Sequence, residues 1–299
     1  MEVKIFQVDA FTSTPFTGNP AGVVLDAEGL SHDQMQEIAK EMNLSETAFI
    51  TPIDDDNYKA RFFTPTHEVD LCGHATIASF YTLALKKRIR PLYNGIKKVF
   101  QHTKLGPLEV EIYYKDGQVN KVVMQQATPE DLGVIEDIDL LLEAFNLEDK
   151  DIGVEEKFIN PRIISTGLPD IQLAIRDKER LDNLKVDLNR LKLLSQKTNT
   201  IGVHAFYLPE IGSNRVYVRN FAPLVGIAEE AATGTSNGGL AYLLKKEGLI
   251  RGNELIAIQG EALNRPSRIH CIIERIDEDF EIKVGGQAVI VLEGTIYLP

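Results

Sequence analysis

Two stretches of this chain are apolar on nearly every side of a helix. The run from Ile77 to Leu85 follows Gly73-His74-Ala75-Thr76, and the run from Leu240 to Leu244 follows a segment that begins at Gly234. A helix without a polar side has no face for solvent and must be buried. The first run is also too short and too polar at its start to cross a bilayer. The pattern therefore predicts two core helices, each preceded by glycine.

Around these two runs, hydrophobic positions alternate or form short blocks, which predicts strands. The strands expected in the first half are 3–10, 21–25, 43–50, 58–63, 98–102 and 108–114. Those expected in the second half are 119–125, 162–165, 172–176, 204–208, 215–221, 255–259, 268–275, 280–284 and 288–298. Amphipathic helices are expected after Ser31, which forms a capping box with Gln34, and at 137–145 and 186–197.

The two core helices belong to a longer repeat. Arg61-Phe62-Phe63-Thr64-Pro65 precedes the first and Arg219-Asn220-Phe221-Ala222-Pro223 precedes the second. Each copy then has a short loop with an acid, Asp70 or Glu230, before the glycine. Two copies indicate a duplicated domain. The predicted fold class is α+β, with two pseudo-symmetric domains, each a mixed β-barrel or curled sheet around a central buried helix.

The predicted boundary between the halves is the turn Lys115-Asp116-Gly117. This gives an N-terminal half at 1–117 and a C-terminal half at 118–299, and two domains suit a chain of 299 residues. The last strand, about 288–298, either stays in the second half or packs back on the first. The simplest arrangement places the active site in a cleft between the halves, with both helix starts directed at it.

Composition narrows the class of partner. The net charge of −12 argues against nucleic acid or an anionic membrane as the main partner, although local dipoles can still bind a small anion. The two cysteines are far apart and suggest neither a disulfide framework nor a zinc cluster, which fits a reducing cytoplasm. The first residues resemble a strand rather than a signal peptide, and no transmembrane run is present in the sequence.

Glu46 is the sharpest candidate for chemistry. It lies in the apolar stretch from Leu44 to Ile50, where alternation places it on the same face as those two residues. If that face is inward, burial raises the pKa of the carboxyl group, which suits a general acid/base at neutral pH. The alternative is an exposed glutamate at a strand end.

Other polar residues near the helix starts have structural explanations of their own. His74 could be a packed helix-start histidine, and Asp70 and Glu230 could simply complement a helix dipole. Glu229 is expected to be a solvated neighbour. Cys72 could be a thiolate near a helix N-terminus. The second copy has Thr233 at the corresponding position, and Cys271 is expected in a core strand. A two-thiol racemase is therefore disfavoured.

Familiar cofactor motifs are missing from the sequence. No group of histidine, cysteine or acidic residues has metal-ligand spacing, so no metal is expected. The dinucleotide pattern Gly-x-Gly-x-x-Gly and the P-loop are absent, and Gly234–Gly239 lacks the Lys-Ser/Thr that a P-loop requires.

Taken together, several motifs resemble the PhzF family of phenazine biosynthesis proteins, relatives of diaminopimelate epimerase. They run in order along nearly the whole chain: 8–11 with Phe16-Thr17-Gly18-Asn19-Pro20-Ala21, 43–49, 61–65, Cys72-Gly73-His74-Ala75-Thr76, 232–235, and 259–260 with Arg265-Pro266-Ser267. The resemblance implies two pseudo-symmetric halves, an active site between them, a homodimer and no cofactor.

The resemblance also implies roles for individual residues. Glu46 matches the family glutamate that moves a proton during isomerisation of a dihydro-hydroxyanthranilate, and His74 matches a histidine of the same pocket. Glu230 and Thr235 stand where the family has aspartate and serine. The longer acid and the extra methyl group would reshape that pocket. Asn19 belongs to a matching motif and is expected to contact substrate.

The expected function is a cofactor-independent isomerase that moves a proton between carbons of a small carboxylic acid. Glu46, His74 and Glu230 are the candidate catalytic residues. The amide groups at Gly73–Ala75 and Gly234–Ser236 would hold the carboxylate. The alternatives are an epimerase or racemase of an amino or hydroxy acid, and a non-catalytic protein that binds a small anion.

Overall fold

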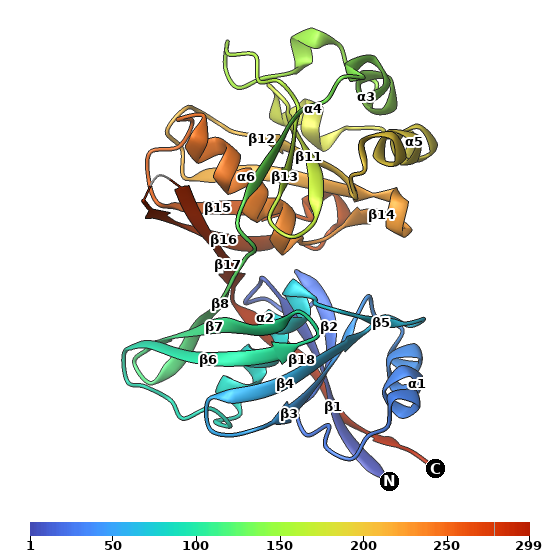
Figure 1. The fold of residues 1–299 in the computed structure, drawn as a ribbon, viewed down its shortest axis with the longest axis vertical. Coiled ribbons are helices and arrows are strands. Elements are labelled where there is room, and N and C mark those ends of the chain that lie inside the picture. The colour runs from blue at the N-terminus through green and yellow to red at the C-terminus, as the bar shows by residue number, and fades with distance from the viewer. Residues whose placement is uncertain (278) are drawn as a thin grey trace. The chain divides into compact units, whose positions relative to one another are not determined.

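The computed structural model describes residues 1–277 and 279–299 and divides them into two compact units (Figure 1). The first unit contains Met1–Gln125 and Gly285–Pro299, and the second contains Gln126–Val284. The division at 117–118 expected from the sequence differs from this, because Asp116 and Gly117 form the turn between two paired strands inside the first unit. The chain passes from one unit to the other after Gln125 instead.

The first unit contains two helices and nine strands among the described residues. They are β1 (Glu2–Ala10), β2 (Asn19–Val24), α1 (His32–Met42), β3 (Thr47–Pro52), β4 (Asn57–Phe63), β5 (Glu68–Val69), α2 (Gly73–Leu85), β6 (Gly95–Thr103), β7 (Gly106–Lys115), β8 (Gln118–Gln125) and β18 (Ala288–Tyr297). The last strand, whose placement the sequence leaves open, pairs antiparallel with β1.

Helix α2 is the centre of the first unit, as its all-apolar pattern predicts. Ten of its residues are buried, and it contacts β1, β2, β3, β7, β8 and β18 (Figure 1). Helix α1 instead packs one face against β3 and β4, where Met35, Ile38 and Ala39 join a separate apolar cluster. Its start has the capping box of Ser31 and Gln34 that the sequence predicts.

The second unit has the same plan with more helices. Its elements are β9 (Glu130–Val134), α3 (Ile138–Phe145), β10 (Arg162–Ser165), β11 (Pro169–Ala174), α4 (Lys178–Asp182), α5 (Leu188–Thr198), β12 (Gly202–Tyr207), β13 (Arg215–Ala222), β14 (Ile227–Glu230), α6 (Gly234–Lys246), β15 (Glu254–Gln259), β16 (Ser267–Ile276) and β17 (Asp279–Gly286). Short 3-10 turns cover 149–151, 223–225 and 261–263.

Helix α6 is the buried helix of the second unit and contacts β10, β11, β12 and β16. Gly238 and Gly239 allow this close packing: a Cβ on Gly238 would lie 3.2 Å from Thr166 Oγ1, and one on Gly239 would lie 3.2 Å from Ile164 Cγ2. Helices α3 and α5 pack against each other outside the sheet, over a second apolar cluster that includes Leu191 (Figure 1).

The strand pairings show the duplication directly. In the first unit β1 pairs antiparallel with β2, β2 parallel with β3, β3 antiparallel with β4, and β4 parallel with β6. In the second unit the same alternation joins β10, β11, β12, β13 and β15. The predicted fold class, a curled mixed sheet around a central helix in each half, is therefore confirmed.

One predicted strand is shorter than expected. The segment 43–46 is a loop, since Asn43 ends α1 in the left-handed conformation (φ 50°) and β3 begins only at Thr47. Glu46 therefore precedes the strand. Alternation could not have placed it, because the four residues 47–50 are buried on both faces of the sheet.

Candidate active site

The start of α2 presents backbone amides that the helix does not use. Its N-cap is Cys72, whose side chain makes no capping hydrogen bond. The first helical hydrogen bond runs from Thr76 N to Cys72 O at 3.0 Å, so the N–H groups of Gly73–Ala75 precede it. Beyond its own turn, no atom of the described residues lies within 4 Å of where a Cβ on Gly73 would be. This helix start therefore has room for a small anion.

Glu46 and His74 lie together beside these amides. Oε2 of Glu46 is 3.3 Å from Nε2 of His74, and Oγ of Ser45 is also 3.3 Å from that nitrogen. The backbone carbonyl of Glu46 accepts a hydrogen bond from Gly22 N of β2 at 3.0 Å, which fixes the loop. The side chain of Glu46 is 19% exposed and that of His74 is 6% exposed. Although Glu46 is outside the strand, its carboxylate is directed inward at the helix start.

The electrostatics favour a neutral histidine in this pair. Burial lowers the pKa of His74 below its usual 6.5, and the nearby Glu46 carboxylate opposes that shift only in part. Nε2 of the ring lies between two oxygens, the Glu46 carboxylate and the Ser45 hydroxyl. Nδ1 lies 3.4 Å from Sγ of Cys72.

The same three side chains form a possible metal-binding group that sequence spacing did not reveal. One ligand atom each from Glu46, Cys72 and His74 lies within 4.8 Å of the others. Carboxylate, thiolate and imidazole are donors that zinc accepts. They come from a loop and a helix start, so no regular spacing marks them. Sequence spacing therefore does not reveal this group, and the absence of a metal stays a prediction.

The start of α6 repeats the arrangement in the second unit. Thr233 is the N-cap and its side chain does not cap the helix. Its hydroxyl donates instead to Oε2 of Glu230 at 2.8 Å, so Glu230 lies directly at this helix start. Thr235 is half-buried, and its carbonyl accepts a hydrogen bond from Thr166 Oγ1 at 2.8 Å. The Ser236 hydroxyl donates a hydrogen bond to Asp170 in the core. Of the polar groups of Ser236, the backbone amide is therefore the one that suits the predicted contact with substrate.

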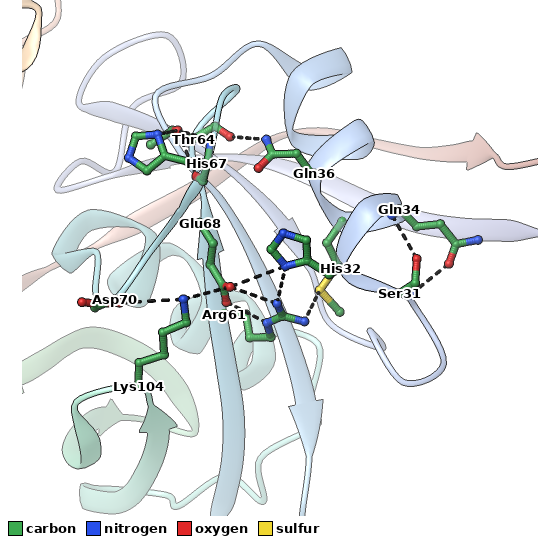
Figure 2. A network of polar contacts seen from close by, with 11 residues as sticks. Ser31, His32, Gln34, Gln36, Arg61, Thr64, His67, Glu68, Asp70 and Lys104 are labelled. Carbon is green, nitrogen blue, oxygen red and sulfur yellow. Dashed lines mark hydrogen bonds and ion pairs between the residues drawn. The ribbon is translucent and has the colours of Figure 1, made fainter.

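The acid that the two copies share is not the one expected from the sequence. Figure 2 shows that Arg61 and Lys104 both contact the carboxylate of Glu68. Arg61 Nε lies 2.7 Å from Oε1, and Lys104 Nζ lies 2.9 Å from Oε2. These cations hold the pKa of Glu68 at about 2. Asp70 lies at the edge of this cluster with a side chain 61% exposed. The expected equivalence of Asp70 with Glu230 is therefore wrong.

The counterpart of Glu68 is Glu229, and both stand five positions before the helix glycine. Arg219 contacts the two oxygens of Glu229 at 2.8 Å each, and its Nη1 donates to three backbone carbonyls at the end of α4 and beyond it. Glu229 is only 11% exposed. The expectation of a solvated Glu229 is also wrong, because this arginine pairs with it. These arginines explain why both copies keep the Arg-x-Phe-x-Pro motif.

The remaining candidates are placed as follows. Asn19 is the first residue of β2, buried and opposite Ala10 of β1. Cys271 is fully buried in β16, and burial raises the pKa of its thiol far above the usual range. This agrees with the expected core role of Cys271 and with the argument against a two-thiol mechanism. Among the described residues, no helix has the length and apolar character needed to cross a membrane.

Comparison with known proteins decides the family. The sequence profile of the PhzC-PhzF family, described as phenazine biosynthesis-like protein, matches residues 8–294. The chain belongs to this family. An uncharacterized isomerase of Clostridium acetobutylicum is 37% identical over 99% of this chain and 98% of its own length. The trans-2,3-dihydro-3-hydroxyanthranilate isomerase of Pseudomonas chlororaphis is 32% identical over 97% of this chain and 98% of its own length.

The fold agrees with that assignment. The crystal structure of a Bacillus anthracis phenazine biosynthesis protein of the PhzF family superposes with a TM-score of 0.86 at 26% identity, covering all of both chains. This PhzF-family chain is an enzyme of the isomerase class, as the resemblance of its motifs implies.

Sequence reasoning missed a group of buried polar residues behind the start of α6. Asp170, His204, Asn220 and Gln259 are each at most 3% exposed and are linked through hydrogen bonds. Burial raises the pKa of Asp170 to about 6 and lowers the pKa of His204 to about 4. The available signal was a histidine and an asparagine inside otherwise apolar strands.

Proposed function

We propose that this PhzF-family protein is a cofactor-independent isomerase that moves a proton between two carbons of a small carboxylic acid. The substrate class is a cyclic acid with amino or hydroxyl substituents, similar to trans-2,3-dihydro-3-hydroxyanthranilate. The observation that carries the proposal is the contact of Glu46 with the buried, neutral His74 at a helix start with uncommitted amides.

In the proposed reaction the Glu46 carboxylate takes a proton from a substrate C–H. The electron pair left on that carbon shifts into the conjugated system, and Glu46 returns the proton to a second carbon, so no electrons leave the substrate. The amides of Gly73–Ala75 bind the substrate carboxylate and stabilise the charge that develops. His74 Nε2 lies 3.3 Å from the Glu46 carboxylate and is proposed to keep it oriented.

The start of α6 is proposed to bind substrate as well. The amides of Gly234–Ser236 form the second cradle, and Glu230 with Thr235 contacts the polar substituents of the ring, while Asn19 adds a further substrate contact. Glutamate and threonine at positions 230 and 235 make this part of the site differ from the family's aspartate and serine, so these two residues select the substituents. From the resemblance we also propose a homodimer that works in the cytoplasm, and light scattering of the purified chain tests the assembly.

The test uses trans-2,3-dihydro-3-hydroxyanthranilate in D₂O, followed by proton NMR. We expect loss of the starting signals and hydrogen or deuterium at a carbon that had no proton before. Glu46→Gln keeps the size of the side chain but carries no exchangeable acid, so this variant should not turn over the substrate. Conversion by the wild type with an equally active Glu46→Gln variant would exclude the proposed role.

Epimerisation of an amino or hydroxy acid is the second candidate, and one observation favours it. The Cys72 thiol lies 3.4 Å from Nδ1 of His74 and could carry a second proton. An epimerase needs two acid/base groups that act on opposite faces of one carbon. Incubation with single enantiomers, followed by polarimetry, separates the two: inversion without movement of a double bond would favour this candidate. Thermal stabilisation by such acids with no turnover of any kind would instead indicate a binding protein.

A further inference from the structure

A continuous chain of hydrogen-bonded side chains runs through the core of the second unit to the start of α6. The Ser236 hydroxyl donates to Asp170, and Asn220 Nδ2 lies 3.2 Å from Ser236 Oγ and 3.1 Å from His204 Nδ1. His204 Nε2 lies 3.2 Å from Asn237 Oδ1, so the chain continues into the helix. All five residues are at most 3% exposed.

This series of hydrogen-bonded side chains ends at Glu230, beside the start of α6. Asn237 Nδ2 donates to Gln259 Oε1 at 2.9 Å, and the same oxygen accepts from Thr233 N at 3.1 Å. Gln259 Nε2 donates to the Glu230 carbonyl at 2.8 Å and lies 3.1 Å from Thr233 Oγ1. That hydroxyl then donates to the Glu230 carboxylate at 2.8 Å. Both the backbone and the side chain of Glu230 are therefore held by Gln259 and Thr233.

The first unit shows that the fold does not need these hydrogen-bonded polar side chains. Phe62 of β4 faces Ala48 of β3, whereas the equivalent pair in the second unit is Asn220 and His204. Counting from the helix glycines, Ala75 corresponds to Ser236.

The next strand completes the comparison. Thr47 of β3 lies between Phe63 and Gly22, and Val203 of β12 lies between Phe221 and Ile171. Gly22 is thus equivalent to Ile171. Ala21 precedes Gly22 as Asp170 precedes Ile171, so Ala21 takes the place of Asp170. The four apolar counterparts in the first unit are all fully buried: Ala21, Ala48, Phe62 and Ala75. The same architecture thus forms with an apolar core, although buried polar groups are costly unless every partner is present.

Only the last members of this hydrogen-bonded series, Asn237 and Gln259, have polar counterparts in the first unit. Thr76 stands at the position of Asn237, and its hydroxyl donates to Gln101 Oε1 at 3.1 Å on the strand equivalent to that of Gln259. Gln101 Nε2 has no hydrogen-bond partner among the described residues, whereas Gln259 Nε2 has two. The clamp on the acid is thus specific to the second unit.

We infer that the buried polar chain is a positioning device, in which Gln259 and Thr233 fix the Glu230 carboxylate and the first turn of α6 for the substrate. This inference rests on the proposed function of that helix start. Gln259 and Thr233 act through Glu230 and the helix backbone and are positioning residues, not catalytic ones.

The test compares four variants of the full chain. Gln259→Met keeps the volume and removes the bonds to Glu230 and Thr233. Thr233→Val removes the hydroxyl, and Thr233→Ser keeps it. Leu194→Ala is the control, because it lies in the separate apolar cluster of this unit and lowers stability without touching the chain. Two readouts are measured: kcat and KM for trans-2,3-dihydro-3-hydroxyanthranilate, and hydrogen exchange of the Thr233 and Asn237 amides, with the Thr76 amide as reference.

We expect Gln259→Met and Thr233→Val to lower kcat at least ten-fold with KM changed less than three-fold. Exchange at Thr233 and Asn237 should become at least ten-fold faster, with no change at Thr76. Thr233→Ser should stay within three-fold of wild type, and Leu194→Ala should lower the melting temperature with kcat unchanged.

Unchanged amide exchange in Gln259→Met and Thr233→Val would overturn the inference, and so would faster exchange with an unchanged kcat. If the wild type does not turn over this acid, the proposed function fails on that substrate. The amide exchange then decides the inference on its own, since it reports the position of the helix start without any substrate.

Discussion

Replacing Asp170 by asparagine should stabilise the protein, and only above the pH at which this acid ionises. Asp170 is 3% exposed, and its Oδ1 accepts no hydrogen bond from any of the described residues. Burial raises its pKa from 3.8 to about 6, despite the opposing hydrogen bond from Ser236. Asparagine keeps an oxygen for Ser236 and carries no charge, so it removes the cost of ionising a carboxyl group in the core.

The size of the effect follows from the pKa. A rise from 3.8 to about 6, at 1.36 kcal/mol per pKa unit, corresponds to about 3 kcal/mol. Because the folded-state pKa is the higher one, the protonated acid favours folding below pH 3.8, and that contribution is lost as the pH rises through 6. His204, whose pKa is lowered to about 4, changes stability in the opposite direction, since its contribution is lost as the pH falls from 6.5. It titrates in both proteins and therefore cancels from their difference.

The assay is urea unfolding at pH 4.5, 6.0 and 7.5, followed by far-ultraviolet circular dichroism in wild type and Asp170→Asn. The variant should exceed the wild-type free energy of unfolding by about 1 kcal/mol at pH 4.5 and by about 3 kcal/mol at pH 7.5. Asp182→Asn is the matched control, because Asp182 is an exposed aspartate of the same unit and should change stability by about 0.5 kcal/mol or less. An Asp170→Asn variant no more stable than wild type at pH 7.5, or a difference that does not change with pH, would refute the reasoning.

Three further predictions concern the helix starts. Gly73→Ala should leave the free energy of unfolding unchanged or raise it by up to about 1 kcal/mol in calorimetry. It should also raise KM at least ten-fold, because the new methyl group enters the space for the substrate carboxylate. An unchanged KM would contradict this prediction. Arg219→Met should lower the free energy of unfolding by about 3–5 kcal/mol in urea titrations because it leaves Glu229 buried and unpaired, and adding Glu229→Leu should restore most of the loss; no recovery would argue against the pair. Cys72→Ala should keep kcat within ten-fold if Glu46 is the only proton carrier, whereas a hundred-fold loss in steady-state kinetics would favour a thiol-dependent epimerase.

Much of the fold could be predicted because its main signals are local. A helix apolar on all sides must be buried, and this alone identified α2 and α6. Edge elements gave weaker signals: β9 is a short, charged strand, and α4 is a single polar turn of Lys178–Asp182. Both were missed because neither contributes an apolar face that the pattern could reveal.

The site was predicted in part for similar reasons. Glu46 and His74 lie together, as the motif resemblance implies, although the alternation that also singled out Glu46 placed it in a strand that begins only at Thr47. The acid shared by the repeat was misassigned because the loops after Arg61 and Arg219 differ in length; counting from the glycines would have matched Glu68 with Glu229. Only part of the buried polar group behind α6 had a signal in the sequence, His204 and Asn220 in apolar strands, because Asp170 follows a proline and resembles a turn residue.

The most direct test of the central claim is the rate at which wild type and Glu46→Gln form product in D₂O, with the isotope at the carbon that gains a proton recorded for each. Glu46→Gln should form product at a rate at least a hundred-fold lower, in line with the loss of a general acid/base. Product formation by Glu46→Gln at a rate close to wild type, with the same labelling, would contradict the account.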